Sequence, residues 1–399
     1  MKRNLILVFL LVTSCILMSG CTESTGPEVT LIDENYDAQK DYFTHKVDVE
    51  YAKGFTVEYF NNYKLVTVAE PQSDVEYSYI LVQKGTPVPE HDSDSIVIEV
   101  PVDSVAALST TQLPALEIIE ELDKLKAVSA FTYINSAPVR EMIDEGSVEE
   151  VGTGSYMNTE SMVRINPELV LTLTTGIPYD DEHINTLIDL GLKPVVINEY
   201  KEETPLGQAE WLKFISLFFN GEEQANDYFT QVSEDYMELA EKTSSIEERP
   251  TVMSGMAWQG MWYVPGGKSF IAQYIDDAGA SYFWQEDDHT ASVPLDFEAV
   301  FDKGKEADYW VTSSMWNSID DAESEDALYL EFKSLTNENV FTSYAKVNEN
   351  GGNDYYESGT VRPDLVLADF VKMFHPEMVP DHEFVYHKQV EASSGGSEE

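Results

Sequence analysis

The sequence predicts an α/β protein of two lobes, each built on a parallel sheet. One long linking helix joins the lobes, and a small N-terminal β-rich extension precedes them. Three observations predict this class: strand-like runs alternate with helical stretches in two blocks, a long helical region separates the blocks, and Pro- and Gly-punctuated strand patterns come first. Alternation of this kind favours parallel pairing with crossover helices. A chain of 399 residues is long enough for two such cores.

The β-rich extension is predicted over residues 46–102. Three runs in it are short and rich in β-branched and aromatic residues, as strands are. They cover residues 63–68, 77–83 and 96–100. Pro and Gly separate the later runs, which favours turns between them. We therefore expect a small sheet ahead of the first lobe.

The first lobe is predicted over residues 103–204, where buried strand candidates alternate with helical stretches. We expect strands at 105–108, 169–173 and 194–197, and helices at about 114–124 and 183–190. Gly191 ends the second of these helices, since glycine is common just past a helix end.

A linking helical region is predicted over residues 205–248. Trp211, Phe214, Ile215 and Phe218 follow the i, i+3, i+4, i+7 spacing of one helix face, and an apolar face continues after Gly221. The second lobe is predicted over residues 249–390. Its expected elements are strands at 251–255 and 309–312 and helices at 269–278, 297–306 and 364–374. The Ser-, Gly- and Glu-rich tail, residues 391–399, is predicted to be disordered.

The N-terminus has the pattern of an export signal. Lys2 and Arg3 precede an apolar run over residues 5–18 that is too short to span a bilayer but suits a signal peptide. The run ends in Leu-Met-Ser-Gly-Cys at Cys21, which resembles the lipobox of secreted lipoproteins. We expect a signal peptide over residues 1–20, lipidation at Cys21 and a lipidated tether over 21–45. The protein is then extracytoplasmic and anchored to the outer face of the cytoplasmic membrane. Cys15 is a rival lipidation site.

The composition excludes several classes of protein. The chain has 24 basic and 73 acidic residues, a net charge of −49, whereas nucleic-acid binding needs cationic surfaces. Screening shortens the range of self-repulsion in salt, so this charge indicates a halophilic or archaeal-type host. Both cysteines lie at the N-terminus, which leaves the rest of the chain without a disulfide or a thiolate metal site.

Several segments resemble those of the iron-chelate and cobalamin class of ABC substrate-binding proteins. They lie at residues 152–160, 165–171, 205–211, 266–270 and 362–364. In order and spacing, the resemblance runs from about residue 51 to residue 387. It implies two Rossmann-like lobes whose linking helix restricts lobe motion to small angles. It also implies a receptor that delivers a small-molecule metal chelate to an ABC permease dimer with its ATPase.

Two glutamates, Glu160 and Glu298, occupy equivalent places in the two lobes. Each lies just ahead of a helix that leads into a strand of its lobe. The resemblance implies that such glutamates meet arginines of the permease dimer, where two separated carboxylates fix orientation through charge-assisted bonds. Favourable placement at a helix N-terminus is the alternative role for each carboxylate.

Aromatic residues gather near the expected strand ends, where ligands bind in open α/β sheets. Tyr133 and Tyr263 are among them. The ligand contacts that we expect are Tyr156, Tyr179, Trp258, Trp262, Trp284, Trp316 and, as a cation, Arg362. Rigid aromatic faces suit flat or bulky organic ligands.

The sequence has no enzyme signature: neither G-x-S-x-G, nor a P-loop, nor G-x-G-x-x-G after a strand. We expect no catalytic residues and no cofactor. The histidines lack the spacing of zinc ligands, so no direct metal site is expected. The ligand that the resemblance implies is an iron siderophore or haem, with cobalamin or another corrinoid as the alternative. A surface sensor or adhesion module on the same fold is the remaining alternative.

Overall fold

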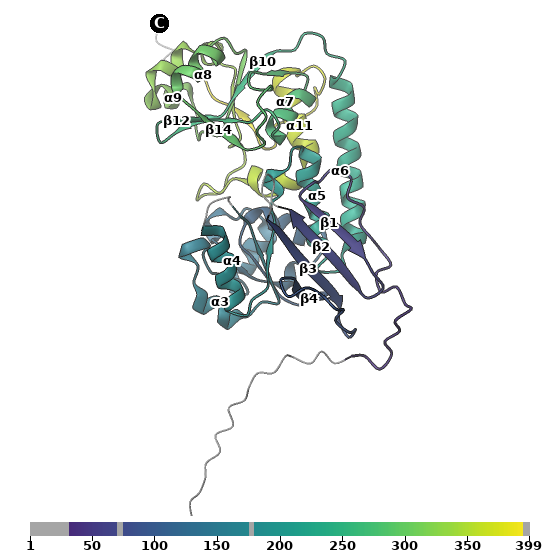
Figure 1. Cartoon of the computed structure of the whole chain (residues 1–399). Coiled ribbons are helices and arrows are strands. Elements are labelled where there is room, and N and C mark those ends of the chain that lie inside the picture. The colour runs from purple at the N-terminus through teal and green to yellow at the C-terminus, as the bar shows by residue number, and fades with distance from the viewer. Residues whose placement is uncertain (1–31, 70–74, 175–178, 394–399) are drawn as a thin grey trace, which may run out of the picture.

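The structure is a computed structural model that describes residues 32–69, 75–174 and 179–393. Two α/β lobes lie one above the other, and helix α6 (Glu222–Thr243) runs along one side of the molecule (Figure 1). The N-terminal sheet lies beside the lower, first lobe (Figure 1). The predicted fold class is confirmed.

The extension is a four-stranded sheet in the order β1-β2-β3-β4. Its strands are β1 (Phe55–Tyr59), β2 (Tyr63–Ala69), β3 (Glu76–Gln83) and β4 (Ile96–Val100). The first two pairings are antiparallel and the third is parallel. Along β2, Lys64, Val66 and Val68 are buried, as the two-residue period of a strand requires.

The predicted tether, residues 21–45, extends too far along the chain. Its first part, with Cys21 and the expected signal peptide, lies outside the described residues. The described part packs on the extension: Phe43 is buried, the Tyr42 amide donates to the Asn61 carbonyl at 2.8 Å, and the Asp33 amide donates to the Gly85 carbonyl at 2.8 Å. An aromatic side chain and backbone hydrogen bonds hold this segment in place.

The first lobe is a five-stranded parallel sheet in the order β7-β6-β5-β8-β9. The strands are β5 (Val105–Ala107), β6 (Leu125–Val128), β7 (Glu149–Glu150), β8 (Leu169–Thr172) and β9 (Pro194–Val196). Its helices are α1 (Leu113–Ile118), α2 (Ala137–Asp144), α3 (Thr159–Ile165) and α4 (Tyr179–Asp189). Helix α1 is shorter than the predicted helix because Glu120 takes a positive φ of 62° soon after it.

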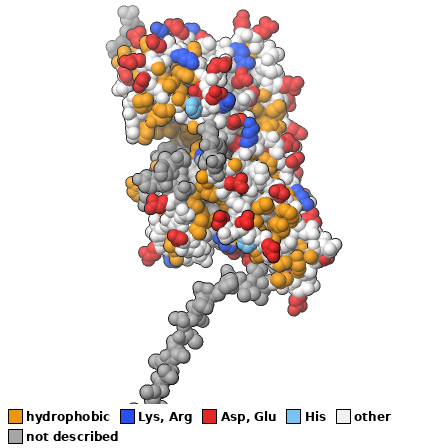
Figure 2. Space-filling view, viewed as in Figure 1, with side chains coloured by type: hydrophobic (Ala, Val, Ile, Leu, Met, Phe, Trp, Pro, Cys, Tyr) orange, Lys and Arg blue, Asp and Glu red, His pale blue; other side chains and the backbone are white. Residues whose placement is uncertain are grey.

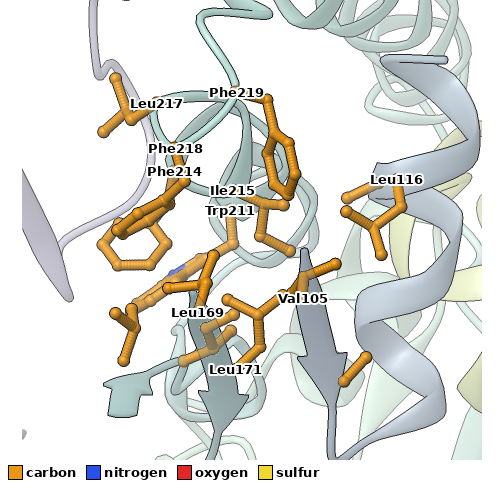
Figure 3. Packing of buried hydrophobic residues seen from close by; sticks show 14 of the residues in the cluster. Val105, Leu116, Leu169, Leu171, Trp211, Phe214, Ile215, Leu217, Phe218 and Phe219 are labelled. Atoms are coloured by element: carbon orange, nitrogen blue, oxygen red, sulfur yellow. The ribbon is translucent and has the colours of Figure 1, made fainter. Parts of the chain in front are cut away.

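The linking region contains α5 (Pro205–Ser216) and then the long helix α6. Between them Asn220 takes a positive φ of 54°, so the backbone leaves the helical conformation before α6 begins. Helix α5 is buried along nearly its whole length, so it forms part of the core. Figure 3 shows side chains from α5 and the turn after it packed close to the first lobe: Trp211, Phe214, Ile215, Phe218 and Phe219. On the first-lobe side lie Val105 of β5, Leu116 of α1, and Leu169 and Leu171 of β8.

The second lobe has a five-stranded sheet in the order β13-β10-β15-β16-β17, parallel except for its last pair. Its strands are β10 (Thr251–Ser254), β13 (Ser281–Tyr282), β15 (Tyr309–Thr312), β16 (Val340–Thr342) and β17 (Lys388–Gln389). The helices are α7 (Phe270–Asp277), α8 (Phe297–Gly304), α9 (Ile319–Glu325), α10 (Lys333–Thr336) and α11 (Pro363–Phe374). The short 3-10 helices of the chain are η1 (Thr110–Gln112), η2 (Leu122–Lys124), η3 (Phe131–Tyr133), η4 (Gly154–Tyr156), η5 (Glu199–Lys201), η6 (Ala327–Glu331), η7 (Asp354–Tyr356) and η8 (Ser358–Val361).

A second, antiparallel sheet in this lobe was not predicted. It consists of β11 (Met256–Trp258), β12 (Met261–Pro265) and β14 (Ser292–Leu295), in the order β11-β12-β14. The tail prediction also begins too early, since the Glu391 amide donates to the Asn317 carbonyl at 2.9 Å. Residues 394–399 lie outside the described ranges.

Buried polar groups hold the extension against the linking region. Lys64 is fully buried in β2, and its ammonium donates to the Leu217 carbonyl at 2.7 Å and to the Glu222 carboxylate. Glu210 of α5 is likewise buried and accepts the backbone amides of Tyr51 at 2.7 Å and Ala52 at 2.8 Å. The extension is therefore fastened to the helices that link the lobes.

Candidate functional site

A cavity of about 610 Å³ lies where the two lobes and helix α5 meet. Its wall is rich in aromatic and hydroxyl side chains. The lining residues include Thr111, Glu199, Tyr200 and Gln208 from the first lobe and α5, and Ser254, Met256, Trp258, Tyr263, Phe270, Tyr274, Thr312, Ser343, Tyr355, Tyr356, Phe370 and His387 from the second lobe. Figure 2 shows one face of the molecule, with acidic side chains spread over both lobes and a hollow between them.

The cavity lies at the carboxyl ends of the sheet strands. Ser254 and Thr312 are the last residues of β10 and β15, and Ser343 directly follows β16. On the first-lobe side, Thr111 follows β5 and Glu199 follows β9 by a few residues. This is the position at which open α/β sheets bind ligands.

The β11–β12 hairpin forms one side of the cavity. Gln259 and Gly260 make its two-residue turn with φ of 51° and 83°, which suits the twist of paired strands. Trp258 is 55% exposed and lines the cavity as predicted, and its ring centroid lies 6.1 Å from that of Tyr263. Gly255 precedes the hairpin because a Cβ there would lie 2.0 Å from the Tyr263 carbonyl oxygen.

Trp262 does not line the cavity, so its predicted position is corrected. Side chains alternate across a strand, and Tyr263 of β12 faces the cavity while Trp262 points to the opposite side. Trp262 is 1% exposed and packs 5.3 Å from the Trp310 ring and 5.6 Å from the Tyr329 ring. It belongs to the core of the second lobe.

Trp284 and Trp316 also lie elsewhere than predicted. Trp284 is buried beside Tyr282, and its ring carries the Lys303 ammonium 5.3 Å from its centroid. Trp316 lines an adjoining hollow of about 410 Å³, and its indole N–H donates to Glu325 at 3.0 Å. Both rings stabilise the second lobe, and neither lines the larger cavity.

Arg362 does not line the cavity either. Its guanidinium donates a bidentate pair of hydrogen bonds to Asp364, from Nε to Oδ1 at 2.9 Å and from Nη2 to Oδ2 at 2.7 Å. The hydrogen bonds from this carboxylate raise the pKa of Arg362 further above its usual range. The pair lies at the start of α11 and leaves Arg362 engaged within its own helix turn.

Of the two first-lobe tyrosines predicted to contact the ligand, only Tyr156 has a described side chain, and it does not line the cavity. Tyr156 ends η4 and is 91% exposed on the surface. Tyr179 is the first residue of α4, but its side chain lies outside what the structure describes.

Glu160 and Glu298 lie in the first turns of α3 and α8, one in each lobe. Both are exposed. Asn158 caps α3 by accepting the Ser161 amide at 3.0 Å, so it supplies the cap that Glu160 does not. Each glutamate lies within the first turn of its helix, not just ahead of the helix as expected, and its role in docking remains a prediction.

Several cavity residues were missed by sequence reasoning. Tyr263 was noted near a strand end, but the two-residue period around Trp262 was the signal that would have selected it. Tyr355 and Tyr356 are adjacent in sequence, and their pKa values are raised by burial. No local signal marked other wall residues, among them Phe270, Tyr274, Phe370, Glu199 and His387.

The cavity wall has one buried carboxyl group and one buried imidazole. Burial raises the pKa of Glu199, against the opposing hydrogen bond from Thr111. His387 uses Nδ1 to contact the Asp369 carboxylate at 3.2 Å. Burial alone would raise the pKa of Asp369, but hydrogen bonds from His382 and His387 hold it well below its usual range. A carboxylate therefore balances any charge on His387.

In the described part of the chain, no group of three or more His, Cys, Asp or Glu residues is arranged to hold a metal ion. Along the same ranges, no helix has both the length and the apolar character needed to span a membrane.

A cavity between two α/β lobes that are bridged by a helix defines a two-lobed solute-binding protein. The chain belongs to the periplasmic binding protein family, whose model matches residues 105–342. This is a family of substrate-binding proteins and not of enzymes. The membership confirms the resemblance seen in the sequence.

Individual relatives agree with this assignment. An uncharacterized lipoprotein of Methanocaldococcus jannaschii is 25% identical over 406 residues, which cover 94% of each chain. The vitamin B12 binding protein of Vibrio cholerae has a TM-score of 0.51 at 16% identity, over 71% of this chain and 99% of that one. An ABC-type Fe3+-hydroxamate transport system protein of Saccharomonospora viridis has a TM-score of 0.53 at 14% identity, over 69% and 94%. At these identities the solved structures establish a shared fold.

Proposed function

We propose that this protein is the extracytoplasmic solute-binding lipoprotein of an ABC importer. It captures an iron chelate, either a siderophore complex or haem, and delivers it to a permease dimer with its ATPase. The observation that carries the proposal is the aromatic cavity of about 610 Å³ between the lobes. Cavities of this size bury most of a small organic ligand, and aromatic walls give large contact area at low entropic cost.

The cavity wall supports a bulky, partly flat ligand. Trp258 and Tyr263 form one side, and Tyr274 stacks on Phe370 with ring centroids 5.5 Å apart at another. Hydroxyl groups of Ser254 and other residues lie among the rings. Of the two solved structures of the same fold, the Vibrio cholerae protein is named for binding vitamin B12, and the Saccharomonospora viridis protein is named for Fe3+-hydroxamate transport. A corrinoid is therefore the second candidate ligand.

Location and delivery complete the proposal. A relative that spans most of this chain is named a lipoprotein, and Cys21 is the residue that we assign as the lipid anchor. Glu160 and Glu298 are assigned to docking because each is exposed on a different lobe. Two such carboxylates can meet the two halves of a twofold permease at once.

Native mass spectrometry of the protein purified from its host tests the proposal. We expect a noncovalent adduct that contains a transition metal and is lost on denaturation. Purified protein without such an adduct, and without tryptophan quenching by haem, ferric hydroxamates or cobalamins, would contradict the assignment. Stimulation of the ATPase by the loaded protein separates an importer component from a surface sensor or adhesion module.

A further inference from the structure

The cavity wall contains an acidic side chain but no Lys or Arg. Apart from its tyrosines, the ionisable residues that line the cavity are Glu199 and His387, and no Lys or Arg is among the lining residues. The adjoining hollow shares Met256, Ser313 and Tyr356 with the cavity. Its lining includes a second carboxylate, Glu325, and again no Lys or Arg. Residues 70–74 and 175–178, which the structure does not describe, include no Lys or Arg in their sequence.

The cations that lie close in sequence to the wall are already engaged. Lys388 directly follows His387 and donates to the Asn317 side-chain oxygen at 2.9 Å, and Lys346 pairs with Asp354. Arg362 is bound by Asp364, and Lys268 pairs with Asp288 at 2.8 Å. Lys201 lies two residues after Glu199, yet it is not part of the cavity wall, and its ammonium donates to Thr174 at 3.0 Å. An anionic ligand in this cavity would therefore meet no guanidinium or ammonium group from these residues.

Glu199 is the acidic side chain that a ligand would meet on the first-lobe side. It is 6% exposed, and its side chain is hydrogen-bonded to Thr111, which also lines the cavity. Burial of a carboxylate without a counter-charge is costly. A cationic ligand supplies that counter-charge and so stabilises the ionised carboxylate. An anionic ligand finds no Lys or Arg in the wall to pair with and gains nothing from Glu199.

His387 does not reverse this balance. Its Nδ1 faces Asp369, whose carboxylate also accepts the backbone amides of Val385 at 2.9 Å, Tyr386 at 2.8 Å and His387 at 2.9 Å. His382 contacts the other oxygen of the same carboxylate at 2.7 Å. Asp369 thus lies between the two imidazoles, and the one that lines the cavity, His387, faces its negative charge.

We infer that the cavity selects a neutral or cationic metal chelate and rejects an anionic one, with Glu199 as the side chain that determines this specificity. The inference rests on the proposed function and narrows its ligand class. Ferric complexes of neutral hydroxamates and cobalamins fall within the class. Tricatecholate iron complexes and haem with two ionised propionates fall outside it.

A charge series on one chelate scaffold tests the inference. Ferrioxamine B carries a terminal ammonium, its N-acetyl derivative is neutral and its N-succinyl derivative is anionic, while the iron core stays the same. Aquocobalamin, cyanocobalamin and haem extend the panel to tetrapyrrole-type ligands. Affinity is measured by calorimetry at neutral pH and low salt. If the ligand is a hydroxamate, we expect ferrioxamine B to bind at least about tenfold more tightly than its N-succinyl derivative. If it is a tetrapyrrole-type chelate, we expect aquocobalamin to bind at least about tenfold more tightly than haem.

Two variants assign the preference to one residue. Glu199→Gln is expected to weaken binding of the cationic probe about tenfold and to leave the neutral probe unchanged. Glu234→Gln on the exposed side of α6 makes the same chemical change away from the cavity and should change neither affinity.

The outcomes separate this inference from the proposed function. An anionic probe that binds as tightly as the cationic one, or a charge preference that survives in the Glu199→Gln variant, overturns the inference and leaves a chelate receptor intact. Failure of the folded wild-type protein to bind any member of the panel overturns the proposed function and the inference together. Because the wild-type series alone measures the preference, a Glu199→Gln protein that fails to fold does not prevent the test.

Discussion

The carboxylate of Glu357 in the second lobe accepts the backbone amide of Ser136 in the first lobe at 2.6 Å. It also accepts the Asn135 amide at 2.8 Å, and its side chain is almost completely buried. Nearby, the Asn348 amide group donates to the Thr132 carbonyl at 2.9 Å. The lobes are therefore joined by a direct polar contact as well as by the linking helices. Glu357 lies between Tyr356 and Gly359, so this contact also positions one wall of the cavity.

This interlobe contact predicts a pH dependence. Burial, with a smaller contribution from Asp354, raises the pKa of Glu357 from its usual 4.5 to about 7, against the lowering effect of the Asn135 and Ser136 amides. The unfolded chain releases this proton near pH 4.5, but the folded chain holds it until about pH 7. The folded state binds more protons in this window, so its stability falls as pH rises from 4.5 to 7, by an amount on the order of 3 kcal/mol.

The Glu357→Gln variant should lack this loss. We expect the difference in unfolding free energy between variant and wild type to shift in favour of the variant from pH 5 to pH 8. Other charged groups near the contact, Glu117 beside Ser136 and Lys346 paired with Asp354, are common to both proteins. Glu349→Gln, at a side chain that is 83% exposed, is the matched control and should show no such shift. Parallel pH profiles for Glu357→Gln and wild type would refute the prediction.

The two tryptophans of the β11–β12 hairpin should behave in opposite ways. Trp258→Ala removes an exposed cavity side chain, so we expect ligand affinity to fall by about 1–3 kcal/mol with little loss of stability. Trp262→Ala empties part of a packed aromatic core and should cost about 3–5 kcal/mol of stability. Denaturant unfolding and ligand titration of both variants check the assignment. Equal effects of the two substitutions on stability would place Trp258 in the core.

The buried ion pair between extension and linking region should be essential to stability. Lys64→Met leaves Glu222 buried without its cation, which typically costs about 3–5 kcal/mol. Lys242→Met breaks an exposed pair with Glu238 on the same helix α6, where both side chains are more than half exposed. That control should cost no more than about 0.5 kcal/mol. Urea unfolding compares the two, and a similar small loss in both variants would show that the extension does not depend on Lys64.

Docking through Glu160 and Glu298 predicts a separation of binding from transport. Replacement of both by Arg should leave ligand affinity unchanged, because both residues lie outside the cavity wall. Uptake and ATPase stimulation in reconstituted vesicles should fall, and more so at low salt, where exposed charges are less screened. The matched control is an Arg replacement of exposed Glu234 and Glu241 on α6. Normal uptake by the Glu160/Glu298 double variant at low salt would exclude the docking role.

Lipidation at Cys21 predicts where the protein is found. Cys21→Ser should release the protein from the membrane fraction or leave it unprocessed, whereas Cys15→Ser should have neither effect. Membrane fractionation and the mass of the N-terminal peptide check both variants. Retention that is lost only with Cys15→Ser would move the anchor to that residue.

The strands that were predicted well are those with a strong local pattern. β2, β3, β8 and β15 are rich in aliphatic and aromatic residues, and their limits lie within a residue or two of the expected ones. The β11–β12 hairpin was missed because its strands are short and its aromatic residues were assigned to a strand-to-helix turn. Once the hairpin is known, the two-residue period separates Tyr263 from Trp262 at once.

Whether each charged residue can contact a ligand depends on the groups that surround it in the folded structure. Arg362 has the chemistry of an anion ligand, but Asp364 occupies both sides of its guanidinium. Glu199 and Glu357 look like any other acidic residues in a chain with 73 of them. Only their burial, beside Thr111 and beside the Ser136 amide, distinguishes them.

The sequence by itself determined the two-lobed α/β fold, the long linking region and the family, because these follow from local periodicity and from motifs read along the chain. The tertiary structure alone decided which aromatic rings form the cavity, which cations are unavailable to a ligand and which carboxylate joins the lobes. Those outcomes depend on contacts between residues as far apart as Ser136 and Glu357. Desolvation and hydrogen bonding act on the neighbours that folding brings together, and a linear pattern does not record those neighbours.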